Sequence, residues 1–213
     1  MRRLPVYLVL DTSGSMTGEP IEGVKNGVQM LVSALRQDPY ALETAYLSVI
    51  AFHTKAEQLV PLTELPSFNA PNLTASGVTS MGEALSLVAD CASREVARTT
   101  AETKGDWKPM VFIMSDGMPT DDWEKGLARF QEEKWGIVVG CAINDGDTAV
   151  LQKICGEAVV KLDTSDSGSI GAFFKWVSAS VSTGSQKVET TMEEVKGLDE
   201  LPPPPPEIDI VGV

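Results

Sequence analysis

The chain has 213 residues, of which 43% are hydrophobic and 22% are charged, so it can form a globular core and global disorder is excluded. Acidic residues outnumber basic ones by 30 to 17, for a formal net charge of -13. Phosphate backbones and anionic membranes repel such a chain unless it carries a local basic patch, and its longest basic cluster is Arg2-Arg3. We therefore expect neither nucleic acid nor a membrane surface as a partner.

Short apolar runs predict strands, and apolar residues at steps of three and four predict helices. In the first half of the chain the predicted elements are a strand over 4–10, a helix over 21–35, strands over 45–52 and 58–65, and a helix over 81–92. Pro61 predicts an edge position for the third strand, because proline cannot donate a hydrogen bond to a neighbouring strand. The segment 66–78 is rich in Pro, Asn, Ser and Gly, which predicts a loop.

The second half continues the alternation. Its predicted elements are a strand over 110–114, a helix over 123–130, a strand over 137–143, a short helix over 150–154, a strand over 158–162 and a last helix over 170–181. Strands that alternate with helices predict an α/β fold with a mostly parallel sheet covered on both faces. Ligands of such sheets bind beyond the carboxyl ends of the strands, where Asp11 and Asp116 lie in this sequence.

The periodicity stops near residue 183. We therefore predict a domain over 1–182, followed by an acidic, proline-rich and flexible tail over 183–213. The tail contains seven acidic and two basic residues and the run Pro202–Pro206, which favours a stiff polyproline II conformation. Two interpretations stay open: a disordered tail, or a segment that docks in a groove or at a sheet edge.

Oxygen-bearing side chains cluster directly after the first predicted strand. Asp11, Ser13 and Ser15 lie in a short turn that contains glycine, so one carboxylate and two hydroxyl groups can converge on a point. Asp116 adds a second carboxylate from another strand end, and Thr79 adds a hydroxyl just before a helix. Hard cations such as Mg²⁺ prefer this set of oxygen ligands. The sequence therefore predicts a cation site at these five residues.

The turn at Asp11, Ser13 and Ser15 resembles the DxSxS motif of von Willebrand factor A domains, and Thr79 and Asp116 match the second and third motifs of that family in order. The resemblance covers roughly residues 4–182. It implies a Rossmann-like, doubly wound fold with a mostly parallel sheet and one antiparallel edge strand. It also implies a metal-ion-dependent adhesion site, in which the five residues hold Mg²⁺, Mn²⁺ or Ca²⁺ and the ion binds an acidic side chain of a partner protein. Such domains usually catalyse nothing.

The stretch from Leu4 to Ile21 is also similar to TerY-type proteins, which are bacterial stand-alone members found in tellurium-resistance clusters. This resemblance implies a cytoplasmic scaffold whose partners are a metal-dependent protein phosphatase, a serine/threonine kinase, or both. A different function is a Mg²⁺-dependent phosphohydrolase of the haloacid-dehalogenase type. We disfavour it, because that chemistry needs an acid/base carboxylate where this chain has Ser13.

Three further expectations concern the surroundings of the site. Met16 and Met118 lie close to predicted ligands, and either a core or an interface role is open for each. The sequence Pro119-Thr120-Asp121-Asp122 is typical of a helix start, so we expect the two aspartates to cap a helix. The last helix leads into the tail, so a conformational change that couples the site to the tail also stays open.

Overall fold

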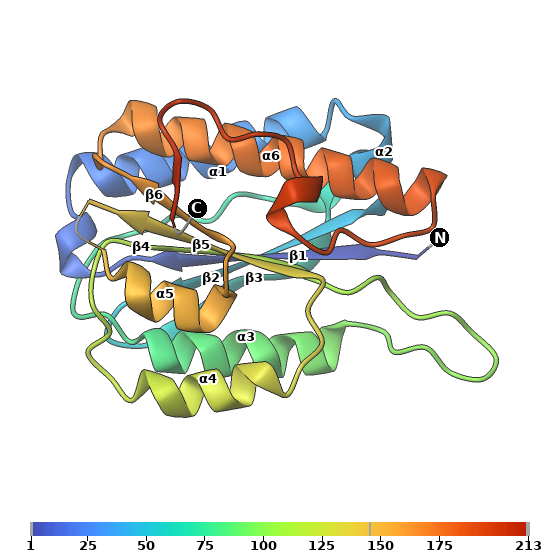
Figure 1. Cartoon of the computed structure of the whole chain (residues 1–213), viewed down its shortest axis with the longest axis horizontal. Helices are drawn as coiled ribbons and strands as arrows, with labels where there is room; N and C mark the ends of the chain where they lie inside the picture. Colours follow the sequence, from blue (N-terminus) through green and yellow to red (C-terminus); the bar gives the residue numbers. More distant parts are fainter. Residues whose placement is uncertain (1, 145, 212–213) are drawn as a thin grey trace.

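The structure is a computed structural model that describes residues 2–144 and 146–211. A central sheet lies between two layers of helices, with α1, α2 and α6 on one side and α3, α4 and α5 on the other (Figure 1). The helices are α1 (Glu19–Leu35), α2 (Pro39–Thr44), α3 (Met81–Glu95), α4 (Trp123–Gln131), α5 (Thr148–Cys155) and α6 (Ser167–Thr190). Short 3-10 helices are η1 (Gly14–Met16), η2 (Leu65–Ser67) and η3 (Leu198–Glu200).

The sheet has seven strands among the described residues, in the order β3-β2-β1-β4-β5-β6-β7. They are β1 (Leu4–Asp11), β2 (Ala45–Phe52), β3 (Ala56–Glu64), β4 (Met110–Ser115), β5 (Ile137–Ile143), β6 (Val159–Leu162) and β7 (Asp209–Ile210). The five inner strands are parallel, as predicted, and β3, which contains Pro61, is an antiparallel edge. The sheet has two antiparallel edges rather than the one expected, because β7 pairs antiparallel with β6.

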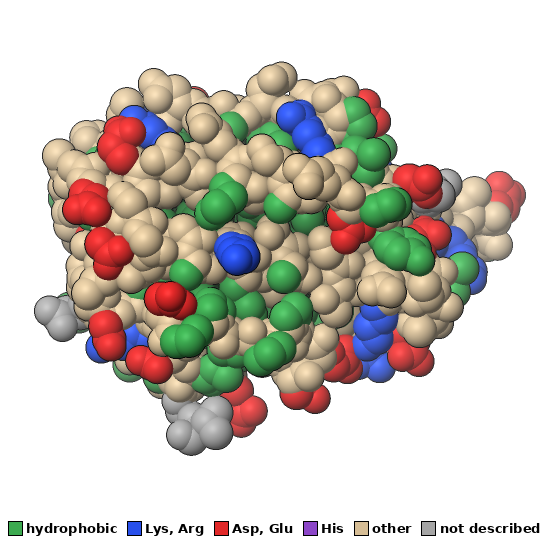
Figure 2. All heavy atoms as spheres, turned by 90° about the horizontal axis from the view of Figure 1, so that it is seen from above, with side chains coloured by type: hydrophobic (Ala, Val, Ile, Leu, Met, Phe, Trp, Pro, Cys, Tyr) green, Lys and Arg blue, Asp and Glu red, His purple; other side chains and the backbone are tan. Residues whose placement is uncertain are grey.

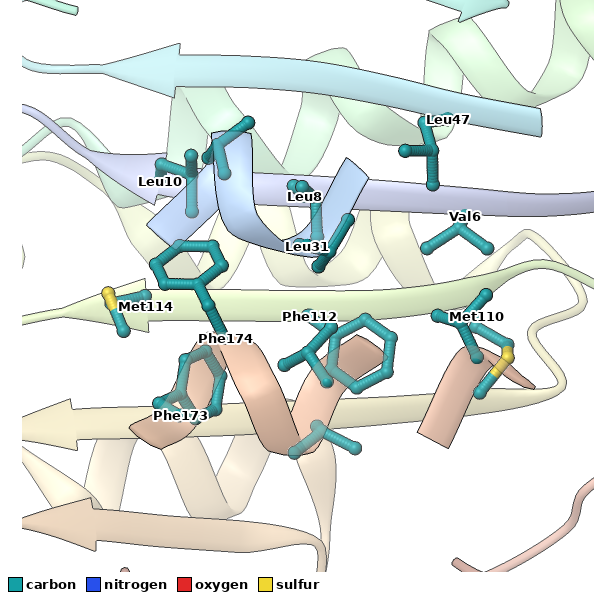
Figure 3. Packing of buried hydrophobic residues seen from close by; sticks show 14 of the residues in the cluster. Val6, Leu8, Leu10, Leu31, Leu47, Met110, Phe112, Met114, Phe173 and Phe174 are labelled. Atoms are coloured by element: carbon teal, nitrogen blue, oxygen red, sulfur yellow. The ribbon is translucent and has the colours of Figure 1, made fainter. Parts of the chain in front are cut away.

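The core has two halves, one on each face of the sheet. Along β1, Val6, Leu8 and Leu10 belong to the cluster shared with α1 and α6, whereas Tyr7 and Val9 belong to the cluster on the other face. This alternation follows from the two-residue period of a strand. Figure 3 shows the first cluster, in which Phe173 and Phe174 of α6 lie over side chains of β1 and β4. Every residue of β1 is buried, which explains its continuous apolar run.

Two helices of this layer approach closely because one of them carries a glycine. A Cβ atom placed on Gly27 of α1 would lie 2.2 Å from the ring of Phe174 in α6. A larger residue at position 27 would therefore displace α6 from the sheet. The close contact of α1 with α6 gives rigid support to the loop over residues 12–18, which joins β1 to α1.

The last helix continues beyond the end that we predicted. α6 runs to Thr190, so the domain boundary expected at residue 182 lies inside this helix. Its second half was missed because Ser, Thr and Gly dilute the apolar pattern, although Val188 is 1% exposed. None of the helices among residues 2–144 and 146–211 is long and apolar enough to span a membrane.

The segment after α6, residues 191–211, lies along the domain, and we call it the C-terminal strap (Figure 1). Leu201 and Ile208 of the strap are buried. The indole Nε1 of Trp176 in α6 donates a hydrogen bond of 2.8 Å to the carbonyl oxygen of Pro202. Beyond this point β7 adds to the sheet edge. In the described part of the tail, the strap lies against the domain, and β7 pairs with β6 of the same chain.

Candidate metal centre

The predicted ligands lie at the carboxyl ends of β1 and β4, which are neighbours in the sheet. Parallel pairing places Leu10 of β1 beside Met114 of β4, so Asp11 and Ser115 come next on adjacent strands. Three loops meet at this edge: the first follows β1, the second precedes α3 and the third follows β4. Residues far apart in the sequence are thereby brought into hydrogen-bonding distance.

Asp11 is the most deeply buried residue of the site, with a relative exposure of 0%. Its Oδ1 accepts a hydrogen bond of 2.8 Å from the backbone N–H of Ser13, and its Oδ2 accepts one of 2.5 Å from Ser115 Oγ. Burial raises the pKa of Asp11, and the bonds from Ser115 and Ser13 oppose that effect. Asp116 nearby raises the pKa further. A carboxylate held in this way is costly without a positive charge beside it.

The two serines link Asp11 to the third loop. Ser13 Oγ and Ser15 Oγ lie 3.0 Å apart, and Ser15 Oγ donates a hydrogen bond of 2.8 Å to Asp116 Oδ1. Ser13 is buried, Ser15 is exposed and Asp116 is half-buried. The oxygen atoms therefore extend from the protein interior to the surface, so the outer part of the cluster is open to solvent.

Thr79 comes from the second loop, which is bonded to both of its neighbours. Its N–H donates to Thr120 Oγ1 at 3.1 Å, and the N–H of Thr120 donates to the Thr79 carbonyl at 2.9 Å. A Cβ atom placed on Gly117 would lie 3.5 Å from Thr79 Oγ1, which shows that the Thr79 hydroxyl adjoins the third loop. Gly14 N–H donates to the Gly77 carbonyl at 3.0 Å and ties the first loop to the second.

The five residues thus form one cluster of two carboxylates and three hydroxyl groups. The described part of the chain contains no group of three or more His, Cys, Asp or Glu residues arranged to hold a metal ion. A site here would therefore depend on hydroxyl ligands, which suit a hard cation, and it has no soft donors for copper or structural zinc. The donor set and the buried charge of Asp11 both fit a divalent cation of the Mg²⁺ class.

Several supporting residues were not identified from the sequence. Ser115 bonds Asp11 and Thr120 bonds Thr79, and only the pairing of β1 with β4 and the meeting of the loops reveal these contacts. Asp121 accepts hydrogen bonds from the N–H groups of Gly82 and Glu83 at 3.0 and 2.9 Å, so it caps α3 from another loop. This is a capping role, as expected, but at a helix distant in the sequence.

The structure also gives the positions of Asp122, Met16 and Met118, the other residues considered near the site. Asp122 caps α4, because its carboxylate accepts from the N–H of Lys125. Met16 is 0% exposed and belongs to the core, whereas Met118 is 68% exposed on the third loop. The two open roles are therefore assigned differently: core for Met16, and surface for Met118.

Comparison with known proteins agrees with this architecture. The family model of the von Willebrand factor type A domain matches residues 6–175. An uncharacterized protein of Synechocystis sp. is 34% identical over 123 residues, which cover 54% of this chain and 26% of that protein. The chain thus spans about a quarter of the length of this curated relative.

Solved structures share the fold at low sequence identity. A von Willebrand factor type A structure from Catenulispora acidiphila has a TM-score of 0.65 and 17% identity, covering 85% of this chain and 43% of that one. The pilus adhesin SpaC from Lactobacillus rhamnosus GG has a TM-score of 0.67 and 14% identity, covering 86% and 31%. Proximal thread matrix protein 1 from the mussel byssus, with a zinc-occupied MIDAS motif, has a TM-score of 0.59 and 16% identity, covering 84% and 48%.

A zinc-occupied MIDAS in that mussel protein shows that the same fold carries a metal at its adhesion motif in another chain. Domains of this family commonly have such a site, mediate protein interactions and are generally not enzymes. The family model covers more than half of this sequence. The chain therefore belongs to the von Willebrand factor type A domain family.

Proposed function

We propose that this protein is a metal-dependent protein-interaction module. The residues that would hold the cation are Asp11, Ser13, Ser15, Thr79 and Asp116. The observation that carries the proposal is the continuous hydrogen-bonded series from buried Asp11 through Ser13 and Ser15 to Asp116. We favour Mg²⁺ because every donor is a hard oxygen, and Mn²⁺ and Ca²⁺ accept the same ligands.

A bound cation supplies the positive charge that a partner's Asp or Glu side chain needs at this edge. Asp11 is buried and Ser15 is exposed, so the side of the cluster that faces solvent is the one a partner can reach. Without the ion, the carboxylates of Asp11 and Asp116 repel an acidic partner. The same surface would therefore change from repelling to attracting such a partner when the ion binds.

The finer function that we propose is that of a cytoplasmic scaffold of the TerY type in a bacterial tellurium-resistance or stress-signalling system. Its partners would be a metal-dependent protein phosphatase, a serine/threonine kinase, or both. Support comes from the similarity of residues 4–21 to TerY-type proteins. Co-purification from the native host in Mg²⁺ and in chelator, followed by identification of the captured proteins, tests this part of the proposal.

We also propose that the protein is not an enzyme. The position where a phosphohydrolase would need an acid/base carboxylate is Ser13, whose hydroxyl lies 3.0 Å from Ser15 Oγ. A hydroxyl does not exchange protons near neutral pH as a carboxylate does. Turnover of p-nitrophenyl phosphate that disappears in Asp11→Asn would contradict this statement.

Calorimetric titration with Mg²⁺ tests the site itself. Wild-type protein should bind one equivalent, and Asp11→Ala should abolish binding, because it removes the buried carboxylate. Asp199→Ala is the matched control, since it removes an equal charge from an exposed position in the C-terminal strap and should leave Mg²⁺ affinity unchanged. Equal Mg²⁺ binding by wild type and Asp11→Ala would refute the assignment.

A further inference from the structure

We infer that Val78 and Met118 form an apolar rim beside the metal site, and that the matching partner presents an aliphatic side chain next to its single carboxylate. This inference rests on the function proposed above and specifies the partner. Val78 directly precedes Thr79, and Met118 follows Asp116 by two residues. Their relative exposures are 49% and 68%, so most of the Met118 side chain is open to solvent.

The three loops differ in what they present at the surface. In the first loop the apolar side chain, Met16, is 0% exposed and the neighbouring Ser15 is exposed. The second and third loops present Val78 and Met118 instead. The exposed large apolar side chains at the site therefore come from the second and third loops and not from the first, which gives a bound partner a defined orientation.

Hydrogen bonds fix the second and third loops to each other. Thr79 and Thr120 exchange two hydrogen bonds, and Asp121 of the third loop bonds the first turn of α3. Gly77 has φ of +70°, and a Cβ atom there would lie 2.0 Å from Thr54 Oγ1, so the second loop is tightly seated. Rigid mounting of the rim reduces the conformational entropy that a partner's binding would cost.

Exposed apolar side chains are common on proteins, so only their position next to the predicted ligands indicates a contact surface. Among the described residues the large apolar side chains classed as exposed lie on α1, on α2, in the C-terminal strap and at this site; they are Met30, Tyr40, Leu42, Val78, Met118, Met192 and Ile210. Two of these seven therefore lie within two residues of predicted metal ligands. A flexible methionine adapts to differently shaped apolar side chains, which suits a contact surface.

Acidic side chains around the rim restrict the charge that a partner can carry. Asp122 and Glu83 are exposed at the start of α4 and in the first turn of α3, and Asp121 lies between these helix ends. These carboxylates repel a partner that carries a run of acidic residues. The rim therefore fits one Asp or Glu with an aliphatic neighbour, and it disfavours an acidic cluster.

Three synthetic peptides test this specificity: acetyl-Gly-Gly-Asp-Leu-Gly-Gly-amide, and the same peptide with Ser or with Asp in place of Leu. Each is titrated into isotopically labelled protein in Mg²⁺ and in chelator, and affinity is read from amide chemical shifts. We expect the Leu peptide to bind about fivefold more tightly than the Ser peptide, because it buries part of an aliphatic side chain. The peptide with two Asp residues should bind no more tightly than the Ser peptide.

Variants then assign the preference to the rim. Met118→Ser and Val78→Thr should each reduce the Leu preference while leaving Mg²⁺ affinity unchanged. Met192→Ser is the matched control, because Met192 is also 68% exposed but lies in the C-terminal strap, and this variant should keep the preference. Equal affinity for the Leu and Ser peptides, or a preference that survives Met118→Ser and Val78→Thr together, would overturn the rim inference alone. Peptide binding that is absent, or equal in Mg²⁺ and chelator, would instead overturn the proposed function.

Discussion

The sheet edge with the candidate metal site around Asp11, Thr79 and Asp116, which we call the metal-site edge, and the C-terminal strap differ in the kind of side chain that they bury. At the metal-site edge, buried Asp11 accepts a hydrogen bond from Ser115 at the end of β4, and buried Thr79 bonds Thr120 of the third loop. In the strap, Leu201 and Ile208 are buried against the domain, and the Trp176 indole donates to the Pro202 carbonyl. Ion pairs of Lys108 with Glu194 and of Lys187 with Glu200 join the strap to the domain nearer the surface. The first region buries polar groups, and the second buries apolar surface.

Because of this difference, the metal-site edge is suited to binding and the strap to stabilising the fold. A buried carboxylate such as Asp11 costs free energy in the folded protein, as its raised pKa indicates, and a cation offsets that cost. Buried apolar side chains stabilise the fold whether or not an ion is present. Changes at the metal-site edge should therefore act mainly through metal binding, and changes under the strap mainly through unfolding.

The largest expected effect is at the strap. Trp176→Ala removes an indole that is 3% exposed and should lower the free energy of unfolding by about 3–5 kcal/mol. Urea denaturation followed by circular dichroism measures the change. Trp176→Phe keeps one aromatic ring but loses the hydrogen bond to Pro202 and part of the buried indole, so its cost should exceed about 1 kcal/mol and stay below that of the alanine variant. A loss below 1 kcal/mol for the alanine variant would show that the strap contributes little.

The next effect is at the metal-site edge and depends on the ion. Mg²⁺ at a hundred times its dissociation constant should raise the free energy of unfolding of wild-type protein by about 2.7 kcal/mol. Asp11→Asn should lose this increment, and without metal it should be no less stable than wild type, because a buried charge is removed. Thermal denaturation in Mg²⁺ and in chelator measures both. Strong destabilisation of the metal-free variant would contradict the separation of the two regions.

A smaller effect tests whether the site loops also contribute stability. Asp121→Ala deprives two N–H groups of α3 of a charged acceptor and should cost about 1–2 kcal/mol. Asp147→Ala is the matched control: Asp147 caps its own helix α5, and its loss should cost about 1 kcal/mol. Only Asp121→Ala should also weaken partner binding. Equal partner affinity in the two variants would show that the cap does not position the second loop.

The smallest expected effect is on the stability of the protein at low pH. Hydrogen bonds from the Thr164 hydroxyl and from Ser169 and Gly168 lower the pKa of Asp166, the N-cap of α6, to about 2. This folded-state pKa lies below the ordinary aspartate value near 4. The contribution of the Asp166 carboxylate to folding stability is therefore complete above about pH 4 and is lost as the pH falls toward 2. The melting temperature of Asp166→Asn should therefore approach that of wild type below pH 4. A constant difference from pH 6 to pH 2.5 would contradict this assignment.

Most of the fold was predictable because strand and helix periods are local properties. The strands at 45–52 and 137–143 and the edge role of Pro61 agree with the predictions. Apart from the three 3-10 helices, the elements missed are α2, which has six residues, and β7, which has two. Such short elements depend on contacts from distant parts of the chain, which no local pattern reveals.

The candidate site likewise contains residues that the sequence identifies and residues that only long-range contacts reveal. Four of its five predicted ligands were selected by residue type and by their place after strands, and Thr79 by its place before a helix; the family motifs matched all five. The structure places the loops that carry them at one edge of the sheet. Ser115, Thr120 and the reach of Asp121 to α3 depend on strand register and on how loops meet, so the sequence does not show them. Burial also separated Met16 from Met118, whose local sequence settings are alike.

The C-terminal strap has a consequence for solubility. Unpaired strand edges invite other chains to add to a sheet and aggregate, and proline and short strands resist this. One edge of this sheet is β3, with Pro61, and the other is β7, with two residues. Figure 2 looks onto the face with α1 and α6 and shows acidic side chains around it, which repel a second copy. Because both sheet edges are protected in this way, partner binding at the proposed metal site would not require an exposed strand edge that could also recruit copies of the chain into open-ended assemblies.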